Sequence, residues 1–362
     1  MKHIAICTPE ISYGDAVSSD VLGMFNTLDS QNLKANIFAE NIFISDVIVK
    51  DISCIGNFIK SSEDVIIYHH STGWFKGLNV LTNINCKKII KYHSITPPDY
   101  FYGFSSDHVE TCKGGIEQLN TIANLDLDMY LNDSRFNMVE MISKGVKSSK
   151  CHVVPPFNNI ERLREIKPDF NILNKYNDKK VNILSVGRVA PNKGFAELID
   201  AFALYNNYFN KESRLIIVGD RHPRLSAYIC YLDDKIRSIN LEDSVLFTGK
   251  VNDEQLKSYY LVSRVFALTS YHEGFCLPLV EAMSMKIPVI AYGSAAVPDT
   301  VGNGGIIWED LDINLIAITM NEIVINNNTY FFLGEAGWRE YQNNFTNKII
   351  KEKFLNIIGK YL

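Results

Sequence analysis

Short apolar runs alternate with amphipathic helical patterns along the whole chain, and this alternation constrains the fold more than any other feature. In the first half the predicted strands are residues 4–7, 65–68, 88–92, 129–131 and 151–154. In the second half they are residues 181–186, 215–219, 245–247, 265–268, 288–291 and 305–307. Strands that alternate with helices in this way form parallel sheets. The sequence therefore predicts an α/β protein with two Rossmann-like halves.

Two neighbouring prolines mark the border between the halves. Pro155 and Pro156 precede Phe-Asn-Asn, and a residue before proline is held in an extended conformation, so this stretch predicts a linker. The 362 residues, 46% of them hydrophobic, also exceed what one core usually organises. We expect a first domain over residues 1–157 and a second over residues 158–339. A final helical pattern over residues 338–362 is broken once, near two asparagines.

The charge balance and the cysteines narrow the class of protein. The 36 basic and 41 acidic residues give a net charge of −5, which argues against a nucleic-acid binder that relies on counterion release. The seven cysteines are scattered without a C-x-x-C pair, which favours reduced thiols over disulfides or a zinc site. No apolar run approaches the ~18 residues of a transmembrane helix, and the first residues lead into a predicted strand rather than a signal peptide. We therefore expect a cytoplasmic protein.

Two glutamates with seven residues between them carry the strongest functional signal. Pro278 suits the first turn of a helix, so Glu273 is expected in a loop and Glu281 on the helix that follows. Gly274 allows a close backbone approach, and the next amides precede a helix N-terminus whose partial positive charge favours a phosphate. Two carboxylates that accept hydrogen bonds from hydroxyls, beside an anion site, predict a nucleotide-sugar pocket.

A second cluster strengthens this interpretation. The predicted strand 181–186 ends in Gly187 and Arg188, and Lys193 follows before an amphipathic helix whose predicted N-cap is Asn192. Arg188 and Lys193 are thus expected at the carboxyl end of a parallel strand, where open α/β sheets bind ligands. Both cations can face one pyrophosphate. Ordinary solvated charges are the alternative interpretation of each cluster taken alone.

Together these residues resemble the retaining nucleotide-sugar glycosyltransferases of the GT-B fold, glycosyltransferase family 4, which are typical of bacterial polysaccharide, lipopolysaccharide and O-antigen assembly. The resemblance spans nearly the whole chain. The motifs that carry it are Tyr92-His93-Ser94-Ile95-Thr96-Pro97-Pro98, Gly187-Arg188 with Lys193, Phe247-Thr248-Gly249-Lys250-Val251, the segment from Glu273 to Glu281, and Pro298-Asp299-Thr300-Val301-Gly302. Two positions depart from the family pattern, because Cys276 stands where glycine is frequent and Lys286 where a small residue is frequent.

The resemblance implies a fold and a set of roles. Two Rossmann-like domains would face a central cleft, and residues 340–362 would cross back to the first domain as a helix. Arg188 and Lys193 would stabilise the leaving diphosphate without a metal or another cofactor, and Glu273 would bind the transferred sugar. Glu281 would accept hydrogen bonds from the ribose hydroxyls. The other implied donor-binding residues are Gly274, Phe275, Cys276, Leu277 and Val251.

The first half supplies further candidates. The turn after the first strand contains Gly14 and Asp15, where a flexible loop can face a phosphate or an acceptor hydroxyl. His93 ends a predicted strand, and the resemblance places such a histidine near the donor sugar, although a satisfied structural side chain is the alternative. His69 and His70 also end a strand, and we expect them to line the cleft rather than to bind a metal.

Asp126-Leu127-Asp128 spells D-x-D, a motif that binds a metal and a nucleotide in a different glycosyltransferase fold. It comes directly before the predicted strand 129–131. Two Rossmann-like halves argue against that other fold. We therefore interpret the motif as a turn from a helix to a strand.

The resemblance also suggests a reaction and a location. We expect a hexose to move, with retention, from a UDP- or GDP-linked donor to a hydroxyl of a lipid-linked or growing polysaccharide acceptor at the inner face of a membrane. The candidate surface for peripheral membrane contact comprises Lys144, Lys147, Lys150, Phe136 and Met138, and solvated lysines are the alternative. A nucleotide-sugar-binding paralogue without transfer activity, or a GT-B nucleotide-sugar epimerase, is the other function that the motifs leave open.

Overall fold

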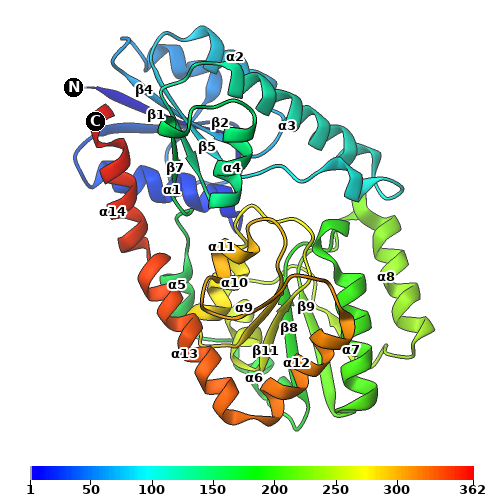
Figure 1. Ribbon diagram of the computed structural model, residues 1–362. Coiled ribbons are helices and arrows are strands. Elements are labelled where there is room, and N and C mark those ends of the chain that lie inside the picture. Colours follow the sequence, from blue (N-terminus) through cyan, green and yellow to red (C-terminus); the bar gives the residue numbers. More distant parts are fainter. Residues whose placement is uncertain (1) are drawn as a thin grey trace. The chain divides into compact units, whose positions relative to one another are not determined.

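The computed structural model describes residues 2–362, and Met1 lies outside the described residues (Figure 1). The chain divides into two compact units. Unit 1 comprises the described residues up to 98 together with 110–159 and 347–362, and unit 2 comprises residues 99–109 and 160–346. Each unit contains its own parallel sheet, so the two predicted α/β halves are present.

Unit 1 is built on a seven-stranded parallel sheet in the order β3-β2-β1-β4-β5-β6-β7. Its strands are β1 (His3–Ile11), β2 (Lys34–Ile42), β3 (Val49–Asp51), β4 (Val65–His70), β5 (Lys87–Tyr92), β6 (Met129–Asn132) and β7 (Cys151–Val153). Its helices are α1 (Ala16–Asp29), α2 (Phe75–Asn83), α3 (Ser106–Asn124), α4 (Arg135–Ser143) and α14 (Asn347–Ile358). The first turn of α3 belongs to unit 2 and the rest to unit 1.

Unit 2 contains a six-stranded parallel sheet in the order β10-β9-β8-β11-β12-β13. Its strands are β8 (Val181–Val186), β9 (Ser213–Val218), β10 (Val245–Phe247), β11 (Val265–Leu268), β12 (Val289–Tyr292) and β13 (Ile306–Trp308). Its helices are α5 (Ile160–Glu165), α6 (Phe170–Tyr176), α7 (Phe195–Tyr208), α8 (Ser226–Ser238), α9 (Asp253–Leu261), α10 (Leu277–Ser284), α11 (Val297–Val301), α12 (Ile313–Ile325) and α13 (Asn327–Asn344).

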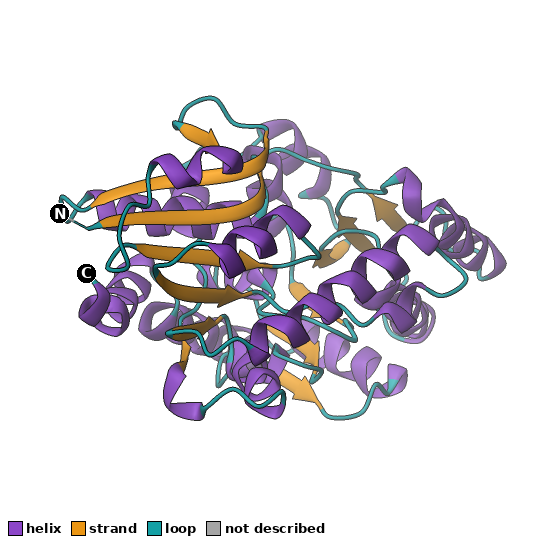
Figure 2. Ribbon diagram, turned by 90° about the horizontal axis from the view of Figure 1, so that it is seen from above, coloured by secondary structure: helices purple, strands orange, loops and turns teal. Residues whose placement is uncertain are grey.

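Each sheet separates two hydrophobic cores, and Figure 2 shows helices on either side of the strands. Along β1, Ile4 and Ile6 belong to one core, and Ala5 and Cys7 belong to the other. Alternate side chains of a strand point to opposite faces, so a sheet covered on both faces needs apolar residues at consecutive positions. This burial explains why the strands appear as short continuous apolar runs in the sequence.

Every strand predicted from the sequence is present, but β2 and β3 were not predicted. β2 has the sequence Lys-Ala-Asn-Ile-Phe-Ala-Glu-Asn-Ile, which mixes polar and apolar residues because its two ends are only partly covered. β3 has three residues and lies at the edge of the sheet. Neither strand is covered along its length, so neither leaves a continuous apolar run in the sequence.

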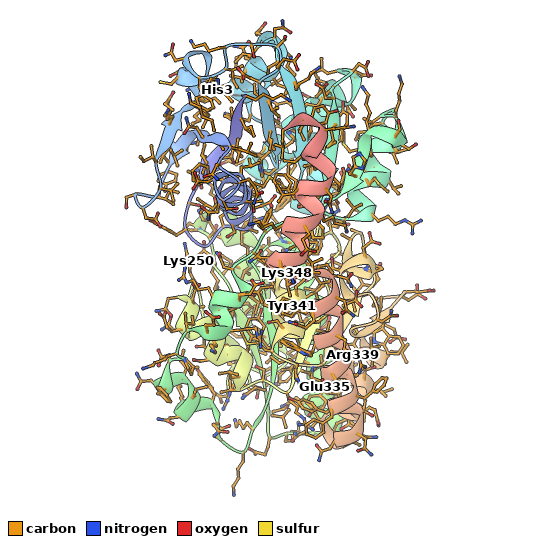
Figure 3. All side chains as sticks on the ribbon, turned by 90° about the vertical axis from the view of Figure 1, so that its left-hand side faces the viewer. His3, Lys250, Glu335, Arg339, Tyr341 and Lys348 are labelled. Atoms are coloured by element: carbon orange, nitrogen blue, oxygen red, sulfur yellow. The ribbon has the colours of Figure 1, made fainter. Side chains whose placement is uncertain are left out.

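The ends of the units differ from the predicted domain bounds. The linker belongs to unit 1 as far as residue 159, not 157, and the chain returns to unit 1 at residue 347, not 340. The later return reflects α13, which packs against α10 in unit 2, with Tyr341 buried. Figure 3 shows Glu335, Arg339 and Tyr341 along this helix. The predicted break in the last helical pattern lies between α13 and α14.

Residues 99–109 belong to unit 2, although the prediction placed them in the first domain. Aromatic contacts explain this assignment. The ring of Phe104 packs edge-on against that of Tyr228 with the centroids 5.2 Å apart, and Tyr100 stacks on Tyr271 at 5.8 Å. These contacts join residues that lie far apart in the sequence, so composition and periodicity gave no sign of them.

Gly219 allows the ends of β8 and β9 to approach closely. A Cβ atom on Gly219 would lie 1.8 Å from the carbonyl oxygen of Gly187. The backbone N–H of Gly187 also donates to the carbonyl of Val218 at 2.9 Å, so the two segments cannot separate without loss of this hydrogen bond. The close approach fixes the start of the loop that carries Arg188.

We expect Gly219→Ala to lower the free energy of unfolding by about 2–3 kcal/mol, because the added methyl group collides with backbone. Thermal denaturation followed by circular dichroism measures the loss. Gly56→Ala is the matched control, since a Cβ atom at Gly56 would meet nothing within 4 Å. Equal melting temperatures for the two variants would contradict the prediction.

Candidate functional site

In unit 2 the loops that follow β8 and β11 meet at one edge of the sheet. The two strands are parallel neighbours, and Lys193 and Glu273 lie in the loops beyond their carboxyl ends. Nζ of Lys193 lies 2.7 Å from Oε1 and 2.9 Å from Oε2 of Glu273. The Glu273 side chain is 8% exposed. The two residues to which the resemblance gives separate roles therefore form an ion pair.

Gly194 shapes the loop after β8. The short 3-10 helix Pro191–Lys193 leads into Gly194, whose φ is 64°. A Cβ atom there would lie 2.0 Å from the carbonyl oxygen of Thr269, and the Thr269 hydroxyl donates to the Gly194 carbonyl at 2.7 Å. Gly194 precedes α7 as its N-cap, so the prediction for Asn192 is wrong. The Asn192 amide instead donates to the carbonyl of His272 at 3.3 Å.

Arg188, the other predicted cation, lies on the surface of unit 2. Burial lowers the pKa of His108, and the positive charge of Arg188 adds to that effect. The Arg188 guanidinium therefore acts electrostatically on the first turn of α3, which belongs to the same unit. An exposed cation at the carboxyl end of β8 is accessible to an anionic ligand.

The glutamate segment has the predicted local structure. Glu273 lies in the loop, Glu281 lies on α10, and Pro278 lies in the first turn of this helix. Cys276 precedes α10 with φ of 72° and is buried. The left-handed region costs an L-residue roughly 1–2 kcal/mol, which explains why glycine is frequent at this position in the proteins that the sequence resembles.

α11 holds the glutamate loop in place. The backbone N–H of Ala296, just before α11, donates to the carbonyl of Glu273 at 3.2 Å. The Thr300 hydroxyl donates to the carbonyl of Phe275, which is buried. The Pro298 to Gly302 motif thus has a structural role that the sequence did not reveal. Gly274 lies in the loop and Leu277 is the first residue of α10, and both are half-buried.

Glu281 is paired with Tyr260, a residue of α9. The Tyr260 hydroxyl donates to Oε2 of Glu281 at 2.7 Å, and Tyr260 is fully buried. Burial raises the pKa of Glu281 to about 7, although the hydrogen bond from Tyr260 opposes this effect. Glu281 thus changes its charge near neutral pH. No motif marks Tyr260, so sequence reasoning missed it.

Val251 follows β10 in a loop that also contains Gly249. Gly249 has φ of 72°, and its carbonyl accepts from the backbone N–H of Gly219 at 3.2 Å. Val251 is half-buried and packs against a core of unit 2. Its neighbour Lys250 is exposed. The Phe247 to Val251 motif therefore lies next to the end of β9.

Two of the three predicted residues of unit 1, Asp15 and His93, have protein partners. Gly14 has φ of 77°, as a tight turn requires. Asp15 is the N-cap of α1, and its Oδ2 accepts from the backbone N–H and the hydroxyl of Ser18, each at 2.8 Å. Nδ1 of His93 lies 2.8 Å from Oδ2 of Asp133. A ligand role for Gly14, Asp15 and His93 stays a prediction.

His69 and His70 are at most 1% exposed, so the expectation that they line a cleft is wrong. Burial, which strips water from a charged imidazolium, lowers the pKa of His70 to about 4. Its Nε2 lies 3.2 Å from the carbonyl oxygen of Gly115. Both histidines point into the covered part of the sheet because β4 lies in the middle of unit 1.

The carboxylates of the D-x-D motif have protein partners. Asp126 Oδ1 lies 2.7 Å from Nζ of Lys150, and Asp128 Oδ2 accepts from the backbone N–H of Lys88 at 2.8 Å. The motif connects α3 to β6, as predicted.

Within residues 2–362, one group of side chains outside this motif could offer three metal ligands. It comprises Asp20, His69 and His93, whose ligand atoms lie within 4.8 Å of one another.

Residues 166–339 match the family model described as glycosyl transferases group 1. The matched residues lie within unit 2. The matched region contains both members of the Lys193–Glu273 pair, together with Arg188 and Glu281.

Among residues 2–362, no helix is both long enough and apolar enough to cross a membrane.

Curated relatives share parts of the chain. Mannosylfructose-phosphate synthase from Agrobacterium fabrum is 26% identical over 221 residues, which cover 59% of this chain and 48% of that protein. O-antigen chain mannosyltransferase B from Escherichia coli is 31% identical over 139 residues, which cover 37% of this chain and 34% of that protein. The matched part thus spans about half the length, or less, of these relatives.

Solved structures resemble the chain over nearly its whole length. The crystal structure of Anabaena HepE in complex with UDP and glucose has a TM-score of 0.78 at 16% identity, and covers 98% of this chain and 99% of that chain. Sucrose-phosphate synthase from Thermosynechococcus elongatus has a TM-score of 0.78 at 17% identity, and covers 99% of each chain. These likenesses identify the fold as GT-B, which confirms the predicted fold class.

We expect Lys193→Met to lower the free energy of unfolding by about 3 kcal/mol, because Glu273 would keep a buried charge without its partner. The double variant Lys193→Met/Glu273→Gln should regain most of that loss. Chemical denaturation of the wild type, both single variants and the double variant measures the coupling. Arg188→Met is the control for an exposed cation and should change stability by less than about 0.5 kcal/mol. Additive losses in the double variant would contradict the expected coupling.

Proposed function

We propose that this protein is a retaining glycosyltransferase that moves a hexose from a nucleoside-diphosphate sugar to a hydroxyl of a lipid-linked or growing polysaccharide. The Lys193–Glu273 pair, at the sheet edge of a glycosyl transferases group 1 domain, is the observation that carries the proposal. Beside the N-terminus of α10, these residues supply a cation for a diphosphate and an acceptor for sugar hydroxyls.

The proposed reaction breaks the bond between the anomeric carbon and a diphosphate oxygen while a bond to the acceptor oxygen forms. Arg188 and Lys193 stabilise the negative charge on the departing diphosphate, and the amides at the start of α10 add to this stabilisation. The proton of the acceptor hydroxyl passes to the departing phosphate on the same face of the sugar. This route gives retention without a nucleophile from the protein, and we propose that it is metal-independent.

The ion pair prepares the site for the donor. Glu273 holds Lys193 at the edge of the sheet before a ligand arrives. An ammonium has three donor hydrogens, so Lys193 can bind a phosphate oxygen and keep one bond to Glu273. The carboxylate oxygen that is released can then accept from a hydroxyl of the transferred sugar. Glu281 accepts from the ribose hydroxyls when it is ionised.

The donor and the acceptor are proposed from the relatives. We propose UDP or GDP as the nucleotide, because the HepE structure holds UDP and one relative is by name a mannosyltransferase of the O-antigen chain. We also propose a cytoplasmic location with peripheral contact at the inner face of a membrane. Of the lysines proposed for that contact, Lys144 donates to the neutral amide oxygen of Asn120 and keeps its charge, whereas Lys150 forms an ion pair with Asp126 within unit 1.

Calorimetric titration with UDP, GDP, dTDP and ADP in the presence of EDTA tests the proposal first. We expect one tightly bound nucleotide, with weaker binding to Arg188→Ala and Glu281→Gln. Turnover with the matching nucleotide sugar should fall by ~10²-fold in Arg188→Ala, because a preorganised cation is lost from the leaving group.

Two variants control this experiment. Arg237→Ala removes an exposed cation from α8, and Glu242→Gln removes an exposed carboxylate from the same unit, so both should bind the nucleotide normally. The absence of binding to any nucleotide would exclude the proposed function. Binding without transfer would favour the nucleotide-sugar-binding paralogue. Activity that EDTA abolishes and manganese restores would show that the proposed metal independence is wrong.

The charge of Glu281 predicts a pH dependence of nucleotide affinity. Its pKa near 7 means that the carboxylate is mostly neutral at pH 6 and mostly ionised at pH 8. The ionised form accepts hydrogen bonds from both ribose hydroxyls, so we expect affinity to rise by up to about tenfold over this range. Calorimetry at each pH measures the rise. Glu281→Gln provides the reference because the nucleotide phosphate also titrates near pH ~6. Equal pH profiles in both proteins would contradict the ribose assignment.

A further inference from the structure

Three segments of unit 2 bring basic side chains together on one side of β8. This strand lies between β9 and β11, and the ion pair of the candidate site joins the loops after β8 and β11. On the other side, the backbone N–H of Val189 donates to the carbonyl of Asp220 at 2.9 Å. The loop that carries Arg188 therefore runs beside the loop after β9, which contains His222 and Arg224.

The third segment comprises residues 99–109 and ends in the first turn of α3. The ring of Phe104 packs against those of Tyr228 and Tyr231 in α8, with the centroids 5.2 and 6.2 Å apart. α8 begins where the loop after β9 ends, so this docking places the half-buried side chain of His108 near that loop. The three segments together form what we call the basic cluster, which comprises Arg188, His108, His222 and Arg224.

The two histidines of the basic cluster are each held through Nδ1. Nδ1 of His222 accepts from the backbone N–H of Arg224 at 3.2 Å, so the hydrogen of the neutral ring is on Nε2. Nδ1 of His108 lies 2.8 Å from Oγ of Ser105, and the ring stacks on Phe101 with the centroids 5.0 Å apart. Nε2 is therefore the nitrogen of each ring that can bind a ligand.

The electrostatic potential within the basic cluster is positive. Burial lowers the pKa of His108, and the other three members lower it further, with the largest electrostatic effect from Arg188. The carboxylate of Asp107 opposes them, but its effect is smaller than that of any of the three. The His108 ring is therefore neutral at pH 7. A bound anion would relieve the repulsion that keeps it neutral.

A neighbouring arginine shows how a cation with protein partners differs from those of the basic cluster. The Arg221 guanidinium forms an ion pair with Asp233 and lies over the ring of Phe247, 4.9 Å from its centroid. Arg188 and Arg224 are exposed, and neither forms an ion pair with any of residues 2–362. Both are therefore available to an anion from solution.

The basic cluster borders the donor site but lies on the other side of β8. α10, whose N-terminus is proposed to bind the donor diphosphate, covers the face of the sheet that holds Leu184. α8, which follows the loop with Arg224, covers the opposite face, which holds Ile183. Arg188 follows β8 between these two regions. One phosphate group can therefore bind on either side of Arg188.

We propose that the basic cluster is a second anion site, which binds a phosphate or diphosphate group of the acceptor. This inference deepens the proposed glycosyl transfer and rests on it. A phosphate offers several acceptor oxygens, so it can take hydrogen bonds from two guanidinium groups and from two imidazole N–H groups. The acceptor is then a phosphorylated saccharide or the diphosphate end of a lipid-linked one, and not a neutral saccharide.

Titration of the imidazole resonances tests the site while the donor site is filled. Inorganic diphosphate or geranyl diphosphate is added to the protein saturated with its tightly bound nucleotide, and the pKa of His108 is followed by NMR. We expect the pKa to rise, because a bound anion favours the charged imidazolium. Equal affinities for the two probes would support a soluble phosphorylated acceptor. Tighter binding of geranyl diphosphate would support a lipid-linked one.

Substitutions of Arg224 test whether the cluster and the donor site are separate. We expect Arg224→Gln to weaken diphosphate binding about tenfold, because one charge-assisted hydrogen bond is lost. Arg224→Lys keeps the charge and should recover part of that loss. Nucleotide affinity should stay unchanged in both variants. Arg237→Gln is the matched control, because Arg237 is an exposed cation in the last turn of α8, paired with Asp234, and it should change neither affinity.

An unchanged pKa of His108 with both probes would overturn the proposal. Equal losses of nucleotide and diphosphate affinity in Arg224→Gln would also overturn it, because that result would place the basic cluster in the donor site. Failure of the wild type to bind any nucleoside diphosphate would instead exclude the proposed function. The His108 titration with inorganic diphosphate alone would then still test whether the basic cluster binds an anion.

Discussion

The hydrogen-bond ladder between β8 and β11 is the constraint on which the candidate site depends. The two strands are parallel, so the loops that follow them leave the sheet at the same edge. Lys193 and Glu273 therefore form a bond of 2.7 Å, although they belong to different motifs. The same rule operates in unit 1, where β4, β5 and β6 bring His69, His93 and Asp133 together. The pairing of strands, more than any single motif, determines which charges meet.

The ion pair between Lys193 and Glu273 also determines which charges the site carries before a ligand binds. A buried carboxylate without a partner would cost several kcal/mol, and Lys193 removes most of that cost for Glu273. Glu281 is different, because its nearest partner is the neutral hydroxyl of Tyr260 and burial raises its pKa. The two glutamates of one motif thus have opposite electrostatic surroundings. One has a cation as its partner, and the other changes its charge near neutral pH.

Features that depend on local rules could be predicted, and features that depend on contacts between distant residues could not. Strands buried on both faces leave apolar runs, and Pro278 fixes the start of α10, so both were predictable. The bond from Tyr260 to Glu281 joins two elements and leaves no sequence pattern. The two departures from the family pattern have a local cause, since Cys276 has φ of 72° and Lys286 has φ of 58°. The unusual residues are visible in the sequence, but only the backbone shows that both positions have the left-handed conformation that favours glycine.

α14 has a consequence for how the protein is made. It follows the whole of unit 2 in the sequence, but Ile350, Phe354 and Ile358 belong to a core of unit 1. The ring of Phe354 packs edge-on against Phe157 with the centroids 5.9 Å apart. During translation the sheet of unit 1 leaves the ribosome first, yet the part of this core that α14 covers stays exposed until α14 has followed. A nascent chain that stops before residue 347 would expose this part of the core to chaperones, so the unit that is made first is the last to be completed.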